Sequence, residues 1–307
     1  MAASSETTIP VICGPTAAGK TQLALWLAAR ADVTIVSADS RQLYTGFDVG
    51  TAKPTVAERR AAPHCGIDVL EPTRRASAAW WADEADGWIR DALAAGRVPL
   101  VVGGTGLYLR ALFGSLFDEP ALDEERRAAL QRELGALSTE TLRRWVAELD
   151  PARATLGRTQ LLRALEIALL TGRRVSELHR ERHRPARWSA RYLVVDPGPD
   201  LAQRIETRVD AMLAAGWRDE VRRLISAVPA DAPAWNATGY RTIRQLEAGE
   251  LSEREAVQRV VVDTRRYAKR QRTWFRHQLA ADDVTRLDPR APDGESRALS
   301  WWRTWDA

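Results

Sequence analysis

Short apolar runs alternate with longer amphipathic stretches in the first hundred residues of this chain. The runs at residues 11–13, 33–38 and 98–102 are rich in Val and Ile and end in Gly or Asp, which predicts buried strands. Residues 20–30 and 76–95 have helical spacing. Strands that alternate with helices predict an α/β fold, in which helices cover both faces of a parallel sheet. Catalytic residues are then expected at the carboxyl ends of the strands.

The pattern changes in the middle of the chain. Residues 122–183 have helical spacing throughout, with Glu and Arg interleaved and no alternation typical of strands. Residues 191–196 then form an apolar run typical of a strand that returns to the sheet. Further helices are predicted at residues 201–215, 219–226 and 253–278.

Composition narrows the class of protein. Of 307 residues, 45% are apolar and 28% are charged, which is typical of a soluble globular enzyme. No run of about 18 or more apolar residues occurs, so no membrane span is predicted. Residues 1–8 lack the basic and apolar regions of a signal peptide. The two cysteines, Cys13 and Cys65, are too few for a disulfide framework or a zinc site. Together these features predict a cytoplasmic protein.

The formal net charge is only +4, but the basic residues are unevenly distributed. Two stretches are rich in arginine, at residues 158–191 and at residues 265–276. In the second stretch aromatic residues interleave with the cations, which is typical of a helix that packs one face in a core. Both stretches fit either a solvated helix surface or a surface that follows the phosphates of a nucleic acid.

A glycine-rich turn follows the first predicted strand and leads into the first predicted helix. Its sequence GPTAAGKT matches the P-loop pattern G-x-x-x-x-G-K-[ST] in full. The residues are Gly14, Pro15, Thr16, Ala17, Ala18, Gly19, Lys20 and Thr21. Backbone N–H groups of such a loop surround phosphate oxygens, the lysine adds a positive charge, and the threonine hydroxyl can hold Mg²⁺. The motif predicts a bound polyphosphate without specifying ATP.

Two further segments follow predicted strands. Asp39 comes directly after the second strand, where it faces the P-loop across the sheet edge. It fits a magnesium ligand, a general base for an acceptor, or a cap of the next segment. Residues 103–108, GGTGLY, follow the third strand, and their glycines permit close approach of another backbone or a ligand.

These features together predict a P-loop NTPase-like parallel sheet with flanking helices and an all-helical insertion domain. Residues 1–120 and 188–290 are assigned to the α/β catalytic core with C-terminal helices, and residues 121–187 to the insertion. Residues 291–307 form a tail. The chain after residue 282 is expected to be loosely ordered, although its three C-terminal tryptophans could dock on the core.

Six segments, in this order along the chain, resemble motifs of the tRNA dimethylallyltransferase family, also called tRNA isopentenyltransferases. They are residues 14–21, 39–44, 103–112, 163–167, 239–240 and 264–271. The chain departs from the family pattern at residues 64–66, which are usually His-His-Leu, and at residues 159–160, which are usually Gln-Arg. It lacks the zinc finger of eukaryotic relatives, so it is most similar to the bacterial members.

The resemblance implies a reaction. Members transfer a dimethylallyl group from dimethylallyl diphosphate to N6 of adenosine 37 in tRNAs that read codons beginning with U. The implied partners are the anticodon stem-loop of tRNA and dimethylallyl diphosphate, the implied cofactor is Mg²⁺, and a monomer with no membrane association is expected.

The resemblance also implies roles for residues of this chain. Asp39, Lys20 and Thr21 are implied to be catalytic, with Thr21 as the metal ligand. Residues 14–21 and Arg208 are implied to bind the diphosphate. The implied tRNA contacts are Asp39, Ser40, Arg41, Gln42, Thr105, Thr159, Gln160, Leu161, Leu162 and Arg163.

Three other functions stay open on the sequence. The first is prenylation of free AMP, ADP or ATP. The second is a small-molecule kinase that uses Asp39 as base and ATP in the P-loop. The third is a non-catalytic RNA-binding module gated by a nucleotide. The predicted helical insertion and the basic C-terminal helix favour a macromolecular acceptor over the first. The Gly103-Gly104 turn and the absence of an obvious adenine or lid signature count against the second.

Overall fold

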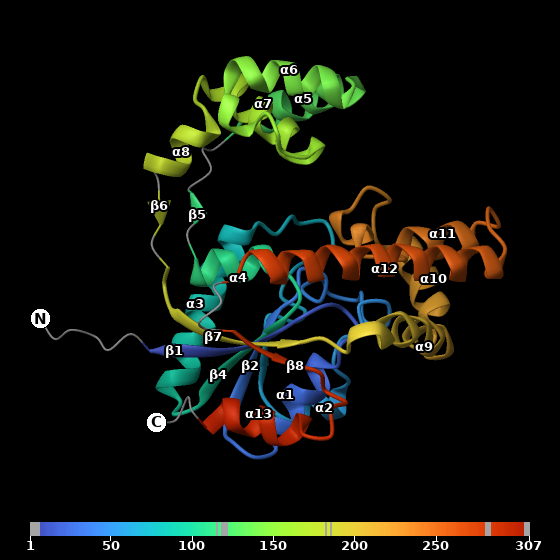
Figure 1. Cartoon of the computed structure of the whole chain (residues 1–307). Helices are drawn as coiled ribbons and strands as arrows, with labels where there is room; N and C mark the ends of the chain where they lie inside the picture. The colour runs from blue at the N-terminus through green and yellow to red at the C-terminus, as the bar shows by residue number, and fades with distance from the viewer. Residues whose placement is uncertain are drawn as a thin grey trace, which may run out of the picture. The chain divides into compact units, whose positions relative to one another are not determined.

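The computed structural model describes residues 7–114, 116–117, 122–181, 183–184, 186–279 and 284–303. The chain forms two compact units, drawn in Figure 1. The first, here called the core unit, comprises residues 1–113 and 187–307, and the second, here called the helical unit, comprises residues 114–186.

The core unit is built on a six-stranded sheet in the order β3-β2-β4-β1-β7-β8, in which every neighbouring pair is parallel. The strands are β1 (Thr8–Cys13), β2 (Val33–Ala38), β3 (His64–Cys65), β4 (Val98–Gly103), β7 (Ser189–Val195) and β8 (Val284–Leu287). This confirms the predicted parallel sheet. In the register Cys13 lies opposite Gly103, and Ala38 also lies opposite Gly103. The P-loop, Asp39 and the glycine turn therefore leave the sheet at one edge.

Helices cover both faces of this sheet (Figure 1). On one face α1 (Lys20–Ala28) and α13 (Gly294–Arg303) share an apolar cluster with β1, β2 and β4. On the other face lie α3 (Ala78–Ala94), α4 (Gly106–Phe113) and the long α12 (Glu253–His277). The rings of Trp81 and Tyr108 stack between α3 and α4, with centroids 4.7 Å apart.

The chain after residue 282 is ordered where the structure describes it, so the expectation of a loose tail was wrong. Strand β8 adds to the sheet edge, and Trp301 of α13 is only 3% exposed in the apolar cluster. The alternative that the tryptophans dock is confirmed for Trp301, while Trp305 lies outside the described residues. Both elements are short, and they acquire stability from burial against the sheet rather than from their own pattern.

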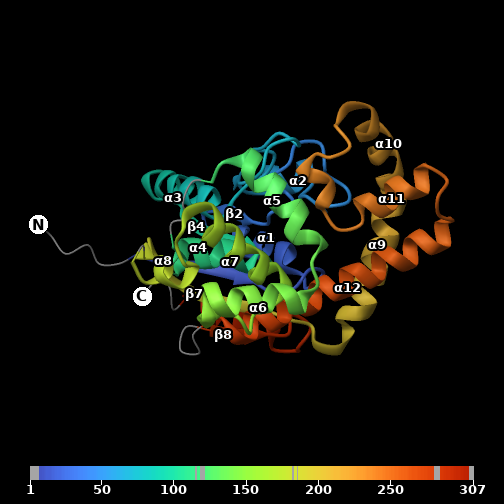
Figure 2. The ribbon, with the colours of Figure 1, turned by 90° about the horizontal axis from the view of Figure 1, so that it is seen from above.

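Three further helices of the core unit gather around the amino-terminal end of α12 (Figure 2). They are α9 (Leu201–Ala214), α10 (Trp217–Ala227) and α11 (Tyr240–Glu247). The short helix α2 (Val56–Ala61) contacts α1 instead. The predicted helices at residues 201–215, 219–226 and 253–278 are confirmed to within a few residues. Short 3₁₀ turns at Gly198–Asp200 and Pro233–Asn236 precede α9 and α11.

The helical unit has its own apolar core, formed by α5 (Glu124–Ala136), α6 (Thr139–Leu149), α7 (Arg158–Thr171) and α8 (Val175–Glu181), with a 3₁₀ turn at Pro151–Arg153. It also contains an antiparallel pair, β5 (Leu116–Phe117) and β6 (His183–Arg184), so the expectation of a purely helical segment is corrected. Two residues per strand are too few to show alternation in a sequence. No helix in the described part of the chain is long and apolar enough to cross a bilayer.

Candidate active site

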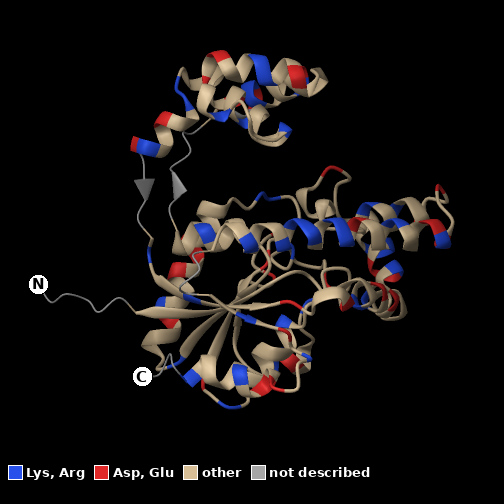
Figure 3. Cartoon of the chain, viewed as in Figure 1, with Lys and Arg blue, Asp and Glu red and all other residues tan. Residues whose placement is uncertain are grey.

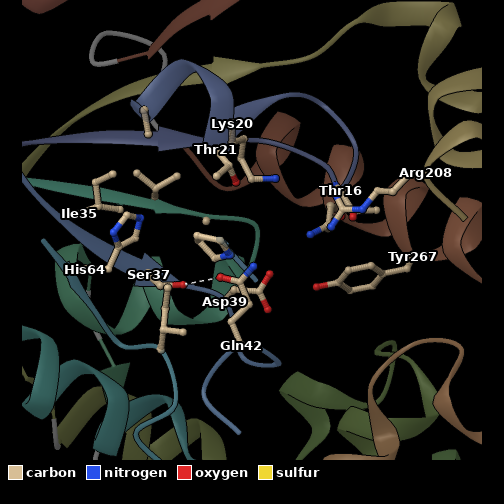
Figure 4. Close-up of a pocket in the computed structure, with 16 residues that line it drawn as sticks. Thr16, Lys20, Thr21, Ile35, Ser37, Asp39, Gln42, His64, Arg208 and Tyr267 are labelled. Carbon is tan, nitrogen blue, oxygen red and sulfur yellow. Dashed lines mark hydrogen bonds between the residues drawn. The ribbon is translucent and has the colours of Figure 1, made fainter. Parts of the chain in front are cut away.

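A cavity lies at the carboxyl edge of the sheet, next to the P-loop (Figure 4). Its lining includes Thr16, Lys20 and Thr21 of the P-loop, Asp39 and Gln42 after β2, Arg208 of α9, and Tyr267 and Gln271 of α12. The structure thus brings together the P-loop, the candidate base and the arginine that the resemblance implied. Tyr267 and Gln271 were not among the predicted site residues.

The P-loop has the backbone geometry that its glycines predict. Gly14 has φ 145°, and a Cβ there would lie 2.1 Å from the carbonyl oxygen of Val195. Ala17 has φ 62°, a conformation that costs an L residue roughly 1 kcal/mol or more. The Lys20 ammonium donates a hydrogen bond of 2.8 Å to the carbonyl oxygen of Pro15. The lysine is therefore folded across the loop, beside the space where phosphates bind in such loops.

Two distant side chains hold the tip of this loop. The Gln271 Oε1 accepts a 2.8 Å hydrogen bond from the Thr16 N–H, and its Nε2 donates one of 2.8 Å to the carbonyl oxygen of Gly104. The Arg204 Nε donates one of 2.9 Å to the carbonyl oxygen of Ala17. These contacts span 255, 167 and 187 residues of sequence, so no local pattern could have revealed them.

The Asp39 carboxylate makes a local hydrogen bond and also faces the cavity. Its Oδ1 accepts a 2.8 Å hydrogen bond from the Arg41 N–H, so Asp39 does cap the following turn. Its side chain also lines the cavity, and the hydroxyl of Tyr267 points toward it (Figure 4). Ser40 donates its N–H to the Thr105 hydroxyl oxygen at 3.0 Å, which joins the segment after β2 to the glycine turn after β4.

Burial in the cavity shifts the pKa values of the groups that line it. Removal of water lowers the pKa of the Lys20 ammonium to about 8, although the nearby Asp39 opposes the shift. Burial likewise lowers the pKa of Arg208, while Asp39 raises it. Burial, with a contribution from Asp39, raises the pKa of Tyr267 to about 12. The site therefore holds poorly solvated cations beside a carboxylate, an arrangement typical of an anion-binding active site.

Close approach explains the glycines that follow β4. A Cβ on Gly103 would lie 2.1 Å from the carbonyl oxygen of Ala38. One on Gly104 would lie 2.3 Å from Nε2 of Gln271, and one on Gly106 would lie 2.3 Å from the Trp274 ring. The turn therefore packs against β2 and against α12, which corresponds to the close backbone approach that was one of the two alternatives left open by the sequence.

A buried carboxylate that the sequence analysis missed holds the segment after Tyr44. The Glu220 Oε2 accepts hydrogen bonds from the N–H groups of Asp48 and Val49, at 2.9 and 2.7 Å, and its Oε1 accepts one of 2.6 Å from the Tyr240 hydroxyl. The Gln42 Nε2 in turn donates to the carbonyl oxygen of Ala52, at 3.1 Å. Glu220 therefore positions the loop on which Gln42 rests.

The oxygen atoms available suit Mg²⁺. The Thr21 hydroxyl and the Asp39 carboxylate line one cavity, and both are hard oxygen donors. Among the described residues no group of three His, Cys, Asp or Glu side chains is placed to hold a metal. That is compatible with Mg²⁺ at a phosphate site, because this ion commonly keeps several waters and takes its other ligands from substrate phosphates.

In the helical unit the predicted tRNA contacts lie on the first turns of α7. Thr159 and Gln160 are exposed, and Arg163 donates a 2.8 Å hydrogen bond to the buried carboxylate of Glu166. Leu161 is fully buried in the core of the unit, so its side chain is not accessible to RNA, contrary to the role that the resemblance implied. Glu166 also accepts from Arg127, at 3.2 Å, which places two guanidinium groups side by side.

Basic residues gather along α12 of the core unit (Figure 3). Those exposed on its carboxyl-terminal half are Arg265, Arg266, Lys269, Arg270 and Arg276. The same helix turns Ala268, Gln271 and Phe275 inward. The aromatic and basic pattern of this helix therefore combines a packed face with an exposed cationic surface.

Comparison with known proteins agrees with this geometry. Residues 42–278 match the family described as IPP transferase, and residues 7–64 match the one described as Isopentenyl transferase. A tRNA dimethylallyltransferase of Anaeromyxobacter sp. (strain K) is 46% identical over 92% of this chain and 98% of its own length.

Solved structures are also similar. A tRNA isopentenylpyrophosphate transferase from Bacillus halodurans superposes with a TM-score of 0.69 and 32% identity, over 97% of this chain and 95% of its own. A eukaryotic dimethylallyltransferase solved acting on tRNA gives a TM-score of 0.79 at 26% identity, over 95% of this chain and 78% of its own. The chain therefore belongs to the IPP transferase family, as the tRNA dimethylallyltransferase motifs in its sequence indicated.

Proposed function

We propose that this protein transfers the dimethylallyl group of dimethylallyl diphosphate to N6 of adenosine 37, in tRNAs that read codons beginning with U, and releases pyrophosphate. The observation that supports this most strongly is the cavity in which Lys20 and Arg208 face the Asp39 carboxylate beside the P-loop. Family membership supports the same reaction.

In the proposed step a new C–N bond forms between N6 and the first carbon of the allyl group. The C–O bond to the diphosphate breaks, and its electron pair leaves with pyrophosphate. The N6 proton passes to the Asp39 carboxylate, which acts as general base. This transfer matters because the N6 lone pair is delocalised into the purine ring, so the amine becomes a good nucleophile only as it loses its proton.

Negative charge builds on the departing pyrophosphate, and the P-loop stabilises it. We assign this role to Lys20, to Arg208 of α9 and to the backbone N–H groups of residues 17 and 19–21, because an N–H group at a helix start attracts anions. The N–H groups of Thr16 and Ala18 instead donate to Gln271 and to the carbonyl oxygen of Pro15. Mg²⁺ held by Thr21 would neutralise part of this charge when bound.

For tRNA we propose contacts from both units. Ser40, Arg41, Gln42 and Thr105 lie around Asp39 and are assigned to the target nucleotide, which must leave its stack to react. Exposed or half-buried residues of α7, together with the basic surface of α12, are assigned to the anticodon stem-loop. Those of α7 are Thr159, Gln160, Leu162 and Arg163. With tRNA as substrate, we expect a monomeric protein of the cytoplasm.

One experiment tests the proposal. Labelled dimethylallyl diphosphate is incubated with the protein and either unmodified bulk tRNA or free AMP, and the products are digested to nucleosides. We expect label in N6-prenylated adenosine from tRNA alone. Transfer to AMP but not to tRNA would instead support a nucleotide prenyltransferase, and phosphorylation from ATP without prenyl transfer would support a kinase.

A further inference from the structure

A lysine outside the P-loop is buried in the segment that follows Asp39. The side chain of Lys53 is only 2% exposed, and its three N–H groups meet three acceptors. These are the carbonyl oxygen of Tyr44 at 2.6 Å, Oδ1 of Asp48 at 2.7 Å, and Oδ1 of Asp68. The ammonium therefore joins points of the chain that lie 9, 5 and 15 residues away from it.

Residues 39–54, here called the cavity loop, are closed on themselves by a second set of contacts. Near the start of the loop, the Gln42 Nε2 donates to the carbonyl oxygen of Ala52, at 3.1 Å. The Gln42 carbonyl oxygen accepts a 3.1 Å hydrogen bond from the Asp68 N–H. Asp68 thus supports the start of the loop through its backbone, while its carboxylate binds Lys53.

Two residues of this network have a left-handed backbone. Ala52 has φ 47° and Asp68 has φ 57°. This conformation is unfavourable for residues other than glycine, and more so for alanine than for aspartate. It persists only where surrounding contacts hold it, and such residues gather at functional sites. Lys53 follows Ala52 directly and binds the side chain of Asp68, so its contacts help to hold both.

Stability alone does not account for a lysine at this position. Removing an ammonium and a carboxylate from water costs free energy that their attraction does not always recover, so apolar side chains often stabilise a fold equally well. An apolar side chain of similar length would fill the space of Lys53 but would make none of its three directional contacts. Those contacts fix the shape of the cavity loop.

We propose that Lys53 is a positioning residue, which holds the cavity loop so that the Asp39 carboxylate faces the cavity. The inference deepens the proposed function and rests on it, because Asp39 is the base of that reaction. All three N–H groups of Lys53 are used within the protein, so it acts through its neighbours. The path runs through Asp68 and Gln42 to the turn in which the Arg41 N–H donates to Asp39, at 2.8 Å.

The test is a double-mutant cycle between Lys53→Met and Asp39→Ala, measured by single-turnover transfer to tRNA. We expect Lys53→Met alone to slow transfer by about 10- to 100-fold, because a displacement of about 1 Å can cost that much. In the Asp39→Ala background the same substitution should change the residual rate less than about twofold, since the residue that Lys53 positions is absent. The dissociation constants for tRNA and for inorganic pyrophosphate should stay within a few-fold.

Hydrogen exchange gives a second measurement that does not depend on transfer. Peptides of the cavity loop should exchange faster in Lys53→Met than in the unaltered protein, whereas peptides of β1 and β4 should not. Arg97→Met is the matched control, because it breaks the ion pair with Asp32 at the opposite, amino ends of β2 and β4. It should alter neither the transfer rate nor the exchange of the cavity loop.

Thermal unfolding verifies that Lys53→Met is folded. If it is not, Asp48→Ala takes its place in the cycle, because the Asp48 side chain is 56% exposed and its removal leaves no buried space. No slowing, equal slowing in both backgrounds, or unchanged exchange of the cavity loop in the folded variant would overturn the proposal. A failure of the unaltered protein to transfer the prenyl group would instead reject the proposed function, and it is recognised before any variant is compared.

Discussion

The core unit and the helical unit use their buried polar groups differently. In the core unit Lys20, Asp39 and Arg208 are gathered around a cavity, and Gln271 and Glu220 hold the loops that border it. In the helical unit the buried Glu166 is enclosed by Arg127, Gln131 and Arg163 of the same unit. The first arrangement leaves a site for a ligand, whereas the second fixes arginines on a surface. We therefore expect the chemistry to be confined to the core unit, while the helical unit contributes RNA contacts alone.

The largest effect should come from the core unit. Asp39→Ala removes the proposed base, so turnover should fall by about 10²–10⁴-fold, while tRNA affinity stays within a few-fold. Single-turnover transfer and filter binding measure the two quantities. Asp32→Ala is the control, because Asp32 pairs with Arg97 at the opposite, amino ends of β2 and β4. Comparable turnover in Asp39→Ala would remove the residue from its role.

A change in the helical unit should act on binding. Arg163→Ala should weaken tRNA binding several-fold and reduce the slope of log affinity against log salt by about one, because one phosphate contact is lost. Turnover at saturating tRNA should change little. Binding isotherms at several salt concentrations provide the measurement, with Arg97→Ala as the control. If the slope stayed the same, Arg163 would make no phosphate contact, and the division between the units would lose its support.

The smallest effect is a pH dependence that belongs to the core unit. The pKa of Lys20 is lowered to about 8, so the ammonium loses its proton as pH rises through that value. The attraction for the diphosphate then weakens, and kcat/KM for dimethylallyl diphosphate should fall above about pH 8. In Lys20→Met this decline should be absent. A decline that persists in that variant would assign the titration to another group.

The site features predicted most accurately from the sequence are those formed by contiguous residues. The P-loop, Asp39 and residues 103–106 each follow a strand directly, so a parallel sheet brings them to one edge. By contrast, the hydrogen bond of Gln271 to Thr16 joins residues 255 positions apart, and only the packing of α12 creates it. Glu220 was missed because its partners are also distant in sequence. In addition, an acidic residue on an amphipathic helix usually faces water.

Short strands and helices were also difficult to predict from the sequence. Strands β3 and β8 depend on their neighbours in the sheet, and α13 depends on the burial of Trp301. In the helical unit the spacing predicted helical structure over residues 122–183 but not which residues face inward, so Leu161 was grouped with exposed neighbours. The direction of a helix face is set by tertiary packing, which a short motif does not report.

The central claim is that the P-loop holds a diphosphate that leaves, and not a nucleoside triphosphate that is consumed. The most direct test is the stoichiometry of inorganic pyrophosphate released during transfer to tRNA, with no nucleoside triphosphate added. The account predicts one pyrophosphate for each prenylated adenosine. Transfer that requires ATP and releases inorganic phosphate from it would contradict the account.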